Sequence, residues 1–180
     1  MMTLDELGWR FPDEVHGWLT VFEGRQLAEL ANGKACLEIG GFKGRSTICM
    51  AQVALSVDSV DDFLGDPSQP DVVPGGTQDE MLANLKRYSL PRVTVHVGKS
   101  SELAKTLPES SFDLAFIDGL HDVKSVWTDT QACLRLLKSG GVIAFHDWCY
   151  ITVREAAKRL LGRDPDGIVG SLAWFTIREK

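Results

Sequence analysis

The sequence predicts an α/β domain built on a doubly wound, Rossmann-like, mostly parallel seven-stranded sheet with helices on both faces. Short apolar segments alternate with longer segments of helical period along most of the 180 residues. Two strand-like segments follow each other directly near the C-terminus, which predicts one antiparallel strand there. The length suits a single domain covering residues 1–180.

The first part of the chain combines a helix, two strands and a glycine-rich turn. An apolar stripe over residues 15–30 predicts a helix that Asn32-Gly33 ends, so residues 1–33 are expected to form a helical lead-in. After it come a buried strand over 35–39, a helix over 44–55 and a second strand over 53–58, with the boundary between the last two left open.

A proline- and glycine-rich loop follows the second strand. Residues 64–76 contain three prolines and three glycines, and loops of this length are often functional, so we expect this one to be flexible. A capping box from Thr77 to Glu80 predicts the next helix. The remaining expected elements are strands over 93–97, 112–117 and 142–145, helices over 101–107, 123–137 and 152–161, and closing strands over 168–169 and 172–177.

The composition argues against several classes of partner. A net charge of −6 and the lack of a Lys/Arg run argue against a nucleic-acid or anionic-membrane surface. No apolar stretch is long enough to span a bilayer. The four cysteines fit neither a zinc site nor a redox pair, so we expect mostly small core residues in a cytoplasmic protein.

Polar or acidic side chains follow all five central strands of the predicted sheet. Because ligands of an open α/β sheet bind beyond the carboxyl ends of its strands, these side chains predict one shared site. In chain order they are Glu38 with its glycine turn, Asp58, the segment 98–101, the segment 118–122, and His146-Asp147.

The glycine turn favours one class of ligand. Its pattern, Gly40-Gly41-x-x-Gly44, differs from the G-x-G-x-x-G fingerprint of dinucleotide-binding proteins. Glu38 before the turn would repel a pyrophosphate and attract a ligand with an amino group and a sulfonium. The turn therefore favours S-adenosylmethionine over an NAD-type nucleotide.

A carboxylate at the end of the second strand can accept hydrogen bonds from both hydroxyls of a ribose. Asp58 occupies this position if the strand ends there, and a solvated turn residue is the alternative interpretation. Asp61 or Asp62 takes the ribose role if the strand ends later.

Four segments together carry a family resemblance. They are LEIGGFKGRST (37–47), VDS (57–59), FDLAFIDGLHD (112–122) and LLKSGGVIAFHDW (136–148). In combination they resemble a small class I S-adenosylmethionine-dependent methyltransferase of the group related to macrocin O-methyltransferase and the cephalosporin-hydroxylase-like proteins. GWLTVFEGRQLAELA (17–31) resembles the lead-in helix of that group, so the resemblance covers nearly the whole chain.

The resemblance implies a role for each matching position. The glycine turn with Glu38 would hold the methionine part of the cofactor, Asp58 would hold the ribose, and Ser100 or Ser101 would lie near the adenine. Asp118 would lie beneath the reacting centre. The implied cofactor-binding residues are Glu38, Gly40, Gly41, Gly44, Ser46, Asp58, Ser100, Ser101, Asp118 and Gly119.

Related O-methyltransferases that depend on a metal place Mg²⁺ at the ends of the fourth and fifth strands. The matching residues here are Asp118, His146 and Asp147. The two carboxylates suit Mg²⁺, which prefers hard oxygen ligands, whereas His146 suits a softer divalent cation. A site without any metal is the third alternative.

His121 lies three residues after Asp118, where the related enzymes carry a Lys or His as general base. A histidine titrates near neutral pH and can accept the proton of a hydroxyl that attacks the methyl carbon. The alternative is that His121 or Asp122 caps the helix that starts at Val123, and Asp122 is the better cap.

These residues predict methyl transfer to the hydroxyl of a small-molecule acceptor, with His121 and Asp118 as the catalytic residues. Two other interpretations are a methyltransferase-like binding or scaffold protein without catalysis, and an enzyme that binds an NAD-type nucleotide. Contacts to the acceptor are expected from the N-terminal segment, the loop at 64–76 or a partner subunit. The resemblance also makes a homodimer plausible.

Overall fold

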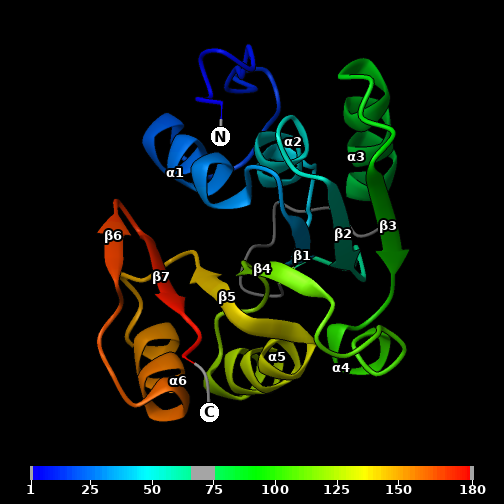
Figure 1. The fold of residues 1–180 in the computed structure, drawn as a ribbon. Coiled ribbons are helices and arrows are strands. Elements are labelled where there is room, and N and C mark those ends of the chain that lie inside the picture. The colour runs from blue at the N-terminus through cyan, green and yellow to red at the C-terminus, as the bar shows by residue number, and fades with distance from the viewer. Residues whose placement is uncertain (1, 66–75, 179–180) are drawn as a thin grey trace.

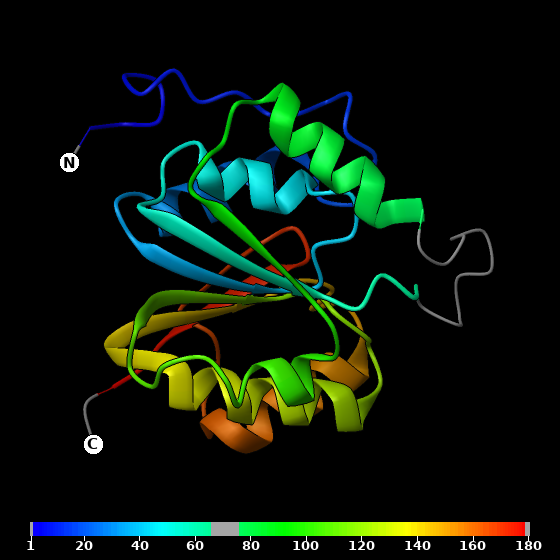
Figure 2. The ribbon, with the colours of Figure 1, turned by 90° about the vertical axis from the view of Figure 1, so that its right-hand side faces the viewer.

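The computed structural model describes residues 2–65 and 76–178 and places one sheet between helices on both of its faces (Figures 1 and 2). Helices α1, α2 and α3 cover one face, and α4, α5 and α6 cover the other (Figure 2). The strands are β1 (Ala35–Ile39), β2 (Ser56–Asp61), β3 (Val93–Val97), β4 (Phe112–Ile117), β5 (Leu137–Phe145), β6 (Gly167–Val169) and β7 (Leu172–Thr176). The helices are α1 (Val21–Ala31), α2 (Arg45–Ala51), α3 (Gly76–Arg87), α4 (Ser100–Leu103), α5 (Val123–Leu136) and α6 (Ile151–Leu161).

The strand order in the sheet is β3-β2-β1-β4-β5-β7-β6. Strands β1 to β5 run parallel, and β7 runs antiparallel to both of its neighbours, β5 and β6. This topology confirms the predicted fold class, including the antiparallel strand near the C-terminus. The strand order reverses between β1 and β4, which is where sheets of this kind bind their ligands.

The core lies on both faces of the sheet because the central strands are buried on both sides. Four of the five residues of β1 and five of the six residues of β4 are buried, as expected for strands inside a parallel sheet. Among the described residues, the largest fully buried side chains are Phe116, Phe145 and Phe175. Three of the four free cysteines are buried and Cys149 is exposed, in line with the expected core role for most of them.

The lead-in helix begins later than the sequence pattern predicts, at Val21 rather than at residue 15. Thr20 caps the helix, and Glu23 completes a capping box with it. Before the cap, the guanidinium of Arg45 donates hydrogen bonds to the backbone carbonyls of Val15, Gly17 and Leu19. These carbonyls are therefore held by a tertiary contact, and the segment runs as an extended strap instead of a helix.

The second strand ends later than predicted, at Asp61 instead of Asp58. The prediction ended the strand too early because its last part contains polar residues, which do not indicate a buried strand. Two of the polar residues of β2 are stabilised by partners on other strands. Ser59 is buried and donates to Glu38 on β1, and Asp58 pairs with His96 on β3 at 2.7 Å. Within the predicted flexible loop, residues 66–75 lie outside the described residues, so its flexibility stays a prediction.

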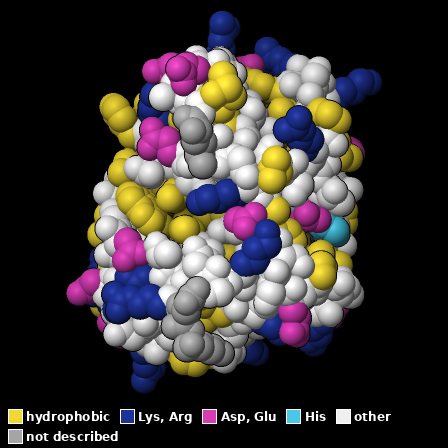
Figure 3. All heavy atoms as spheres, in the orientation of Figure 1, with side chains coloured by type: hydrophobic (Ala, Val, Ile, Leu, Met, Phe, Trp, Pro, Cys, Tyr) yellow, Lys and Arg dark blue, Asp and Glu magenta, His cyan; other side chains and the backbone are white. Residues whose placement is uncertain are grey.

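The surface of the described residues carries charges of both signs. On the face shown in Figure 3, acidic and basic side chains are interspersed and neither sign forms a continuous field. Among the helices that the structure describes, none has the length and apolar character required to cross a membrane.

Candidate functional site

A cavity of about 690 Å³ opens at the carboxyl ends of β1 to β5. It brings together residues from the ends of all five parallel strands, as the sequence predicts. Glu38, Gly44 and Asp58 are not among the residues that line it. The predicted site residues that do line it are Gly40, Gly41, Ser46, Ser100, Ser101, Asp118, Gly119, His121, His146 and Asp147.

The turn after β1 requires glycine for steric reasons. Gly40 has φ +93°, and a Cβ atom there would lie 2.2 Å from the backbone oxygen of Asp118. A Cβ on Gly41 would lie 2.5 Å from Ser59 Oγ. Gly44 adopts a left-handed conformation with φ +88° immediately before α2. The turn thus brings β1 and β4 into close contact and presents its backbone to the cavity.

Glu38 lies beneath this turn and does not face the cavity. Its carboxyl group is fully buried and accepts hydrogen bonds from the hydroxyls of Ser46, Thr47 and Ser59. Burial raises the pKa of Glu38 to about 7, although the three hydrogen bonds oppose this rise. Glu38 therefore supports the turn through these hydroxyls, and its predicted direct attraction to a cationic ligand stays a prediction.

The carboxylates that reach the cavity from β2 are Asp61 and Asp62, whereas Asp58 lies in the middle of the strand. Asp61 accepts hydrogen bonds from the backbone amides of Phe42 at 2.8 Å and Phe63 at 2.7 Å. Burial raises the pKa of Asp61. It therefore ties the end of β2 to the glycine turn, at the position that the sequence offered as the alternative to Asp58.

Acidic groups and a histidine cluster at the ends of β4 and β5. Ligand atoms of Asp118, His121 and Asp147 all lie within 4.8 Å of one another. His121 Nε2 lies 2.8 Å from an oxygen of Asp147, whose backbone has φ +53°. Burial acts to raise the pKa of Asp147, but hydrogen bonds from His121 and His146 outweigh it and hold the pKa well below its usual range. Burial raises the pKa of Asp118.

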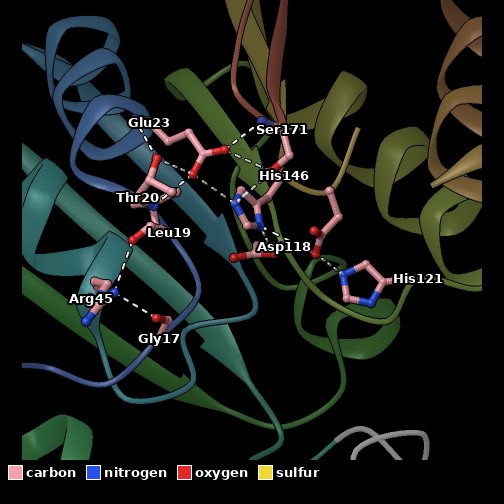
Figure 4. Close-up of polar contacts among 10 residues, drawn as sticks. Gly17, Leu19, Thr20, Glu23, Arg45, Asp118, His121, His146 and Ser171 are labelled. Atoms are coloured by element: carbon pink, nitrogen blue, oxygen red, sulfur yellow. Dashed lines mark hydrogen bonds and ion pairs between the residues drawn. The ribbon is translucent and has the colours of Figure 1, made fainter. Parts of the chain in front are cut away.

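His146 is a buried cation within a shell of carboxylates (Figure 4). Its Nδ1 lies 3.2 Å from Asp118 and 3.4 Å from Asp147, and its Nε2 lies 3.7 Å from Glu23. Burial would lower the pKa of His146, but these three carboxylates raise it to about 12. Both nitrogens thus face carboxylates, and the group whose ligand atoms lie close together consists of Asp118, His121 and Asp147, whereas the sequence predicted Asp118, His146 and Asp147.

Glu23 is a site residue that the sequence reasoning missed. It is 3 % exposed, and it accepts hydrogen bonds from Thr20 and from both the backbone amide and the hydroxyl of Ser171 (Figure 4). The local pattern Thr20-x-x-Glu23 signals a capping box, but it gives no sign that the same carboxylate reaches His146.

The start of α5 and the N-terminal strap also contribute to the surroundings of the cavity. Asp122 caps α5 by accepting from the amides of Lys124 and Ser125, as predicted, and His121 lines the cavity beside it. Trp18 from the N-terminal strap also lines the cavity and packs against Phe42 of the glycine turn, with ring centroids 5.1 Å apart. The strap thus forms part of the cavity wall, and its expected contact with the acceptor stays a prediction.

A family model described as a methyltransferase domain matches residues 37–148, which is more than half of the chain. This range contains the glycine turn and the cluster at the ends of β4 and β5. None of the curated proteins matches the chain.

Solved structures share the fold over nearly the full length. Cofactor-bound Rv0187 from MTB is 24 % identical with a TM-score of 0.70, over 99 % of this chain and 87 % of that one. The O-methyltransferase TomG from Streptomyces achromogenes, in complex with SAM, is 18 % identical with a TM-score of 0.68, over 98 % and 90 %. The O-methyltransferase NovP is 19 % identical with a TM-score of 0.68, over 87 % and 78 %. Identities this low establish a common fold and leave the substrate open.

Proposed function

The chain belongs to the methyltransferase domain family, and from this premise we propose that it transfers the methyl group of S-adenosylmethionine to a hydroxyl oxygen of a small acceptor. The observation that carries the proposal is one cavity that joins a glycine turn to the cluster of Asp118, His121 and Asp147. A proton acceptor and a site for an adenosyl ligand then face the same space.

In this proposal the cofactor lies across the ends of the central strands. The turn at Gly40-Gly41 and the hydroxyl of Ser46 hold its methionine part. Asp61 and Asp62 replace Asp58 as candidates for the ribose hydroxyls, because these two carboxylates line the cavity and Asp58 does not. The adenine lies against the segment 98–101, and Asp118 with Gly119 lies beneath the sulfonium.

His121 acts as the general base, and Asp147 orients it through the 2.8 Å contact with its Nε2. The acceptor hydroxyl gives its proton to the imidazole while its oxygen forms a bond to the methyl carbon. The bond between that carbon and sulfur breaks, and its electron pair stays on the sulfur, which becomes a neutral thioether. Holding oxygen, methyl carbon and sulfur in line supplies most of the rate.

A second form of the proposal assigns His121 to a divalent cation. Two carboxylate oxygens and one imidazole nitrogen within 4.8 Å of one another form a donor set that suits Mn²⁺, Fe²⁺ or Zn²⁺ better than Mg²⁺. A cation bound by Asp118, His121 and Asp147 would lower the pKa of a coordinated acceptor hydroxyl. In this form His121 is a ligand and the acceptor loses its proton without it.

Calorimetric titration with S-adenosylmethionine tests the cofactor site, with NAD as the control ligand. We expect micromolar affinity, about 8 kcal/mol of binding free energy, and no response to NAD. Asp62→Asn and Asp61→Asn are expected to weaken binding, whereas Asp58→Asn, the matched control outside the cavity, is expected to leave it unchanged. Binding of NAD alone would overturn the proposal in favour of a nucleotide enzyme.

Turnover assays with a panel of hydroxyl acceptors separate the remaining alternatives. His121→Ala is expected to lower kcat about 100-fold or more while the affinity for S-adenosylmethionine stays near that of the wild type. Activity abolished by EDTA and restored by Mn²⁺ supports the form with a metal, and activity unaffected by EDTA supports the form with a free base. Tight cofactor binding without turnover of any acceptor would instead favour a scaffold protein.

A further inference from the structure

A buried carboxyl group that the proposed reaction does not use lies behind the segment 98–101. Asp129 on α5 is 4 % exposed and lines the cavity. Its Oδ1 accepts a 2.6 Å hydrogen bond from the hydroxyl of Ser100, the first residue of α4. Within the described residues, no donor forms a hydrogen bond with the other oxygen, Oδ2.

The position of Oδ2 places it against the ligand cavity. A Cβ atom built on Gly119 would lie 3.6 Å from this oxygen, so Oδ2 lies beside the backbone that leaves β4. Ser100, Gly119 and Asp129 all line the same cavity, between the ends of β3 and β4. The Asp129 side chain is almost fully removed from water, and among the described residues only Oδ1 has a hydrogen-bond donor, so a ligand in the cavity can supply a donor to Oδ2.

We propose that Asp129 recognises the exocyclic amino group of adenine in bound S-adenosylmethionine, with Ser100 holding the carboxyl group in position. This inference rests on the proposed function and adds a residue that reads the base. The glycine turn and the carboxylates of β2 already account for the methionine and ribose parts. The adenine amino group is the remaining donor of the ligand, and it suits an acceptor between the ends of β3 and β4.

The chemistry predicts discrimination between two closely related ligands. Adenine presents an amino group, which donates, whereas hypoxanthine presents a carbonyl oxygen at the same position. That oxygen would face Oδ2 with two acceptors opposed and no proton between them. Burial raises the pKa of Asp129 to about 6 against the opposing hydrogen bond from Ser100, so near neutral pH the carboxylate form, which only accepts, predominates.

The test is calorimetric titration with S-adenosylhomocysteine and with S-inosylhomocysteine, which differ in this group of the base. We expect wild-type protein to bind the adenine ligand about 10- to 100-fold more tightly. The amide of Asp129→Asn can donate as well as accept, so this variant is expected to reduce the ratio to about threefold or less. A ratio that Asp129→Asn leaves unchanged, or a wild-type protein that binds both ligands equally, would overturn the assignment.

Two further variants keep the test decisive. Asp113→Asn is the matched control, because Asp113 pairs with Lys138 at 2.8 Å outside the cavity, and it is expected to retain the wild-type ratio. Ser100→Ala removes the hydroxyl that holds Oδ1 and is expected to lower the ratio partially, which serves if Asp129→Asn fails to fold by circular dichroism. Failure of the wild type to bind S-adenosylhomocysteine at all would instead overturn the proposed function.

Discussion

Two glutamates near the same edge of the sheet expose almost no surface to solvent, Glu38 being the more deeply buried, and they are stabilised in opposite ways. Glu38 on β1 is surrounded by three hydroxyl groups, and its pKa is raised to about 7. Glu23 on α1 is 3 % exposed, yet its ion pair with His146 and hydrogen bonds from Thr20 and Ser171 hold its pKa far below the usual range, against the effect of burial.

The difference shows that the donors around a carboxyl group, together with the depth at which it is buried, decide its charge. Hydroxyls are neutral donors and compensate only part of the lost hydration of Glu38. Backbone amides and a protonated imidazole compensate Glu23 more fully, because a charged donor strengthens the hydrogen bond. The glycine turn thus lies over a carboxyl group that is partly protonated near neutral pH, whereas the cluster at β4 and β5 is part of a network of charges.

Removal of Glu23 is expected to have the largest effect. Glu23→Ala takes an anion from beside the buried His146 cation and leaves the amides of Thr20 and Ser171 without their acceptor. We expect the free energy of unfolding to fall by about 3–5 kcal/mol in denaturant titrations, because breaking a buried pair leaves an uncompensated charge. Glu23→Gln keeps an acceptor oxygen and is expected to lose less. A loss below about 1 kcal/mol for Glu23→Ala would contradict the view that Glu23 is a charged partner of the buried His146.

The pH dependence of Glu38→Gln sharpens the comparison. Burial raises the pKa of Glu38 from its ordinary value of 4.5 to about 7, so between these pH values the folded protein binds more protons at this site than the unfolded chain. The contribution of wild-type Glu38 to stability therefore falls as the pH rises through this window.

Because Glu38→Gln removes this titration, the free energy of unfolding of the variant relative to wild type is expected to rise by about 3 kcal/mol from pH 4.5 to pH 7. Denaturant titrations at several pH values measure this difference. Glu23→Gln serves as the opposite control: its pKa is lowered, so the stability that this variant loses should be greatest above pH 4.5 and shrink at lower pH. Equal slopes for both variants would contradict the assignment.

The smallest effect is expected from a single hydroxyl of the shell around Glu38. Thr47→Val keeps the volume of the side chain and removes one of the three donors to the carboxyl group. We expect a loss of about 1 kcal/mol in the free energy of unfolding, the usual net value of one hydrogen bond. Surface Thr106→Val, whose hydroxyl bonds only the backbone of Leu103, is the matched control and should change stability less.

Much of the fold could be predicted from the chain because periodicity is a local property. The alternation of apolar strands and amphipathic helices predicted the parallel sheet. Asp122 followed by an apolar stripe of helical period predicted the start of α5. The end of β2 was misplaced because a strand with Asp58 and Ser59 inside it does not look buried. Their partners, His96 and Glu38, are 38 and 21 residues away in the sequence.

The residues of the candidate site also differ in whether the sequence alone could identify them. The residues that follow strand ends, from the glycine turn to Asp118, His121 and Asp147, were identifiable because parallel strands carry their carboxyl ends to one edge. Glu23 was not, since its bond to Ser171 spans 148 residues, and Asp129 was not, since its partner Ser100 lies on another helix.

The sequence by itself therefore determined the fold class and the edge of the sheet where the candidate site lies, because apolar periodicity and strand ends are local features of the sequence. Only the tertiary structure decided which polar groups are buried together: Glu38 with hydroxyls, Glu23 with His146, and Asp129 with Ser100. The physical reason is that the charge and the partners of a buried group depend on which helices and strands pack against it. Contacts between residues far apart in the chain cannot be inferred from a local sequence pattern.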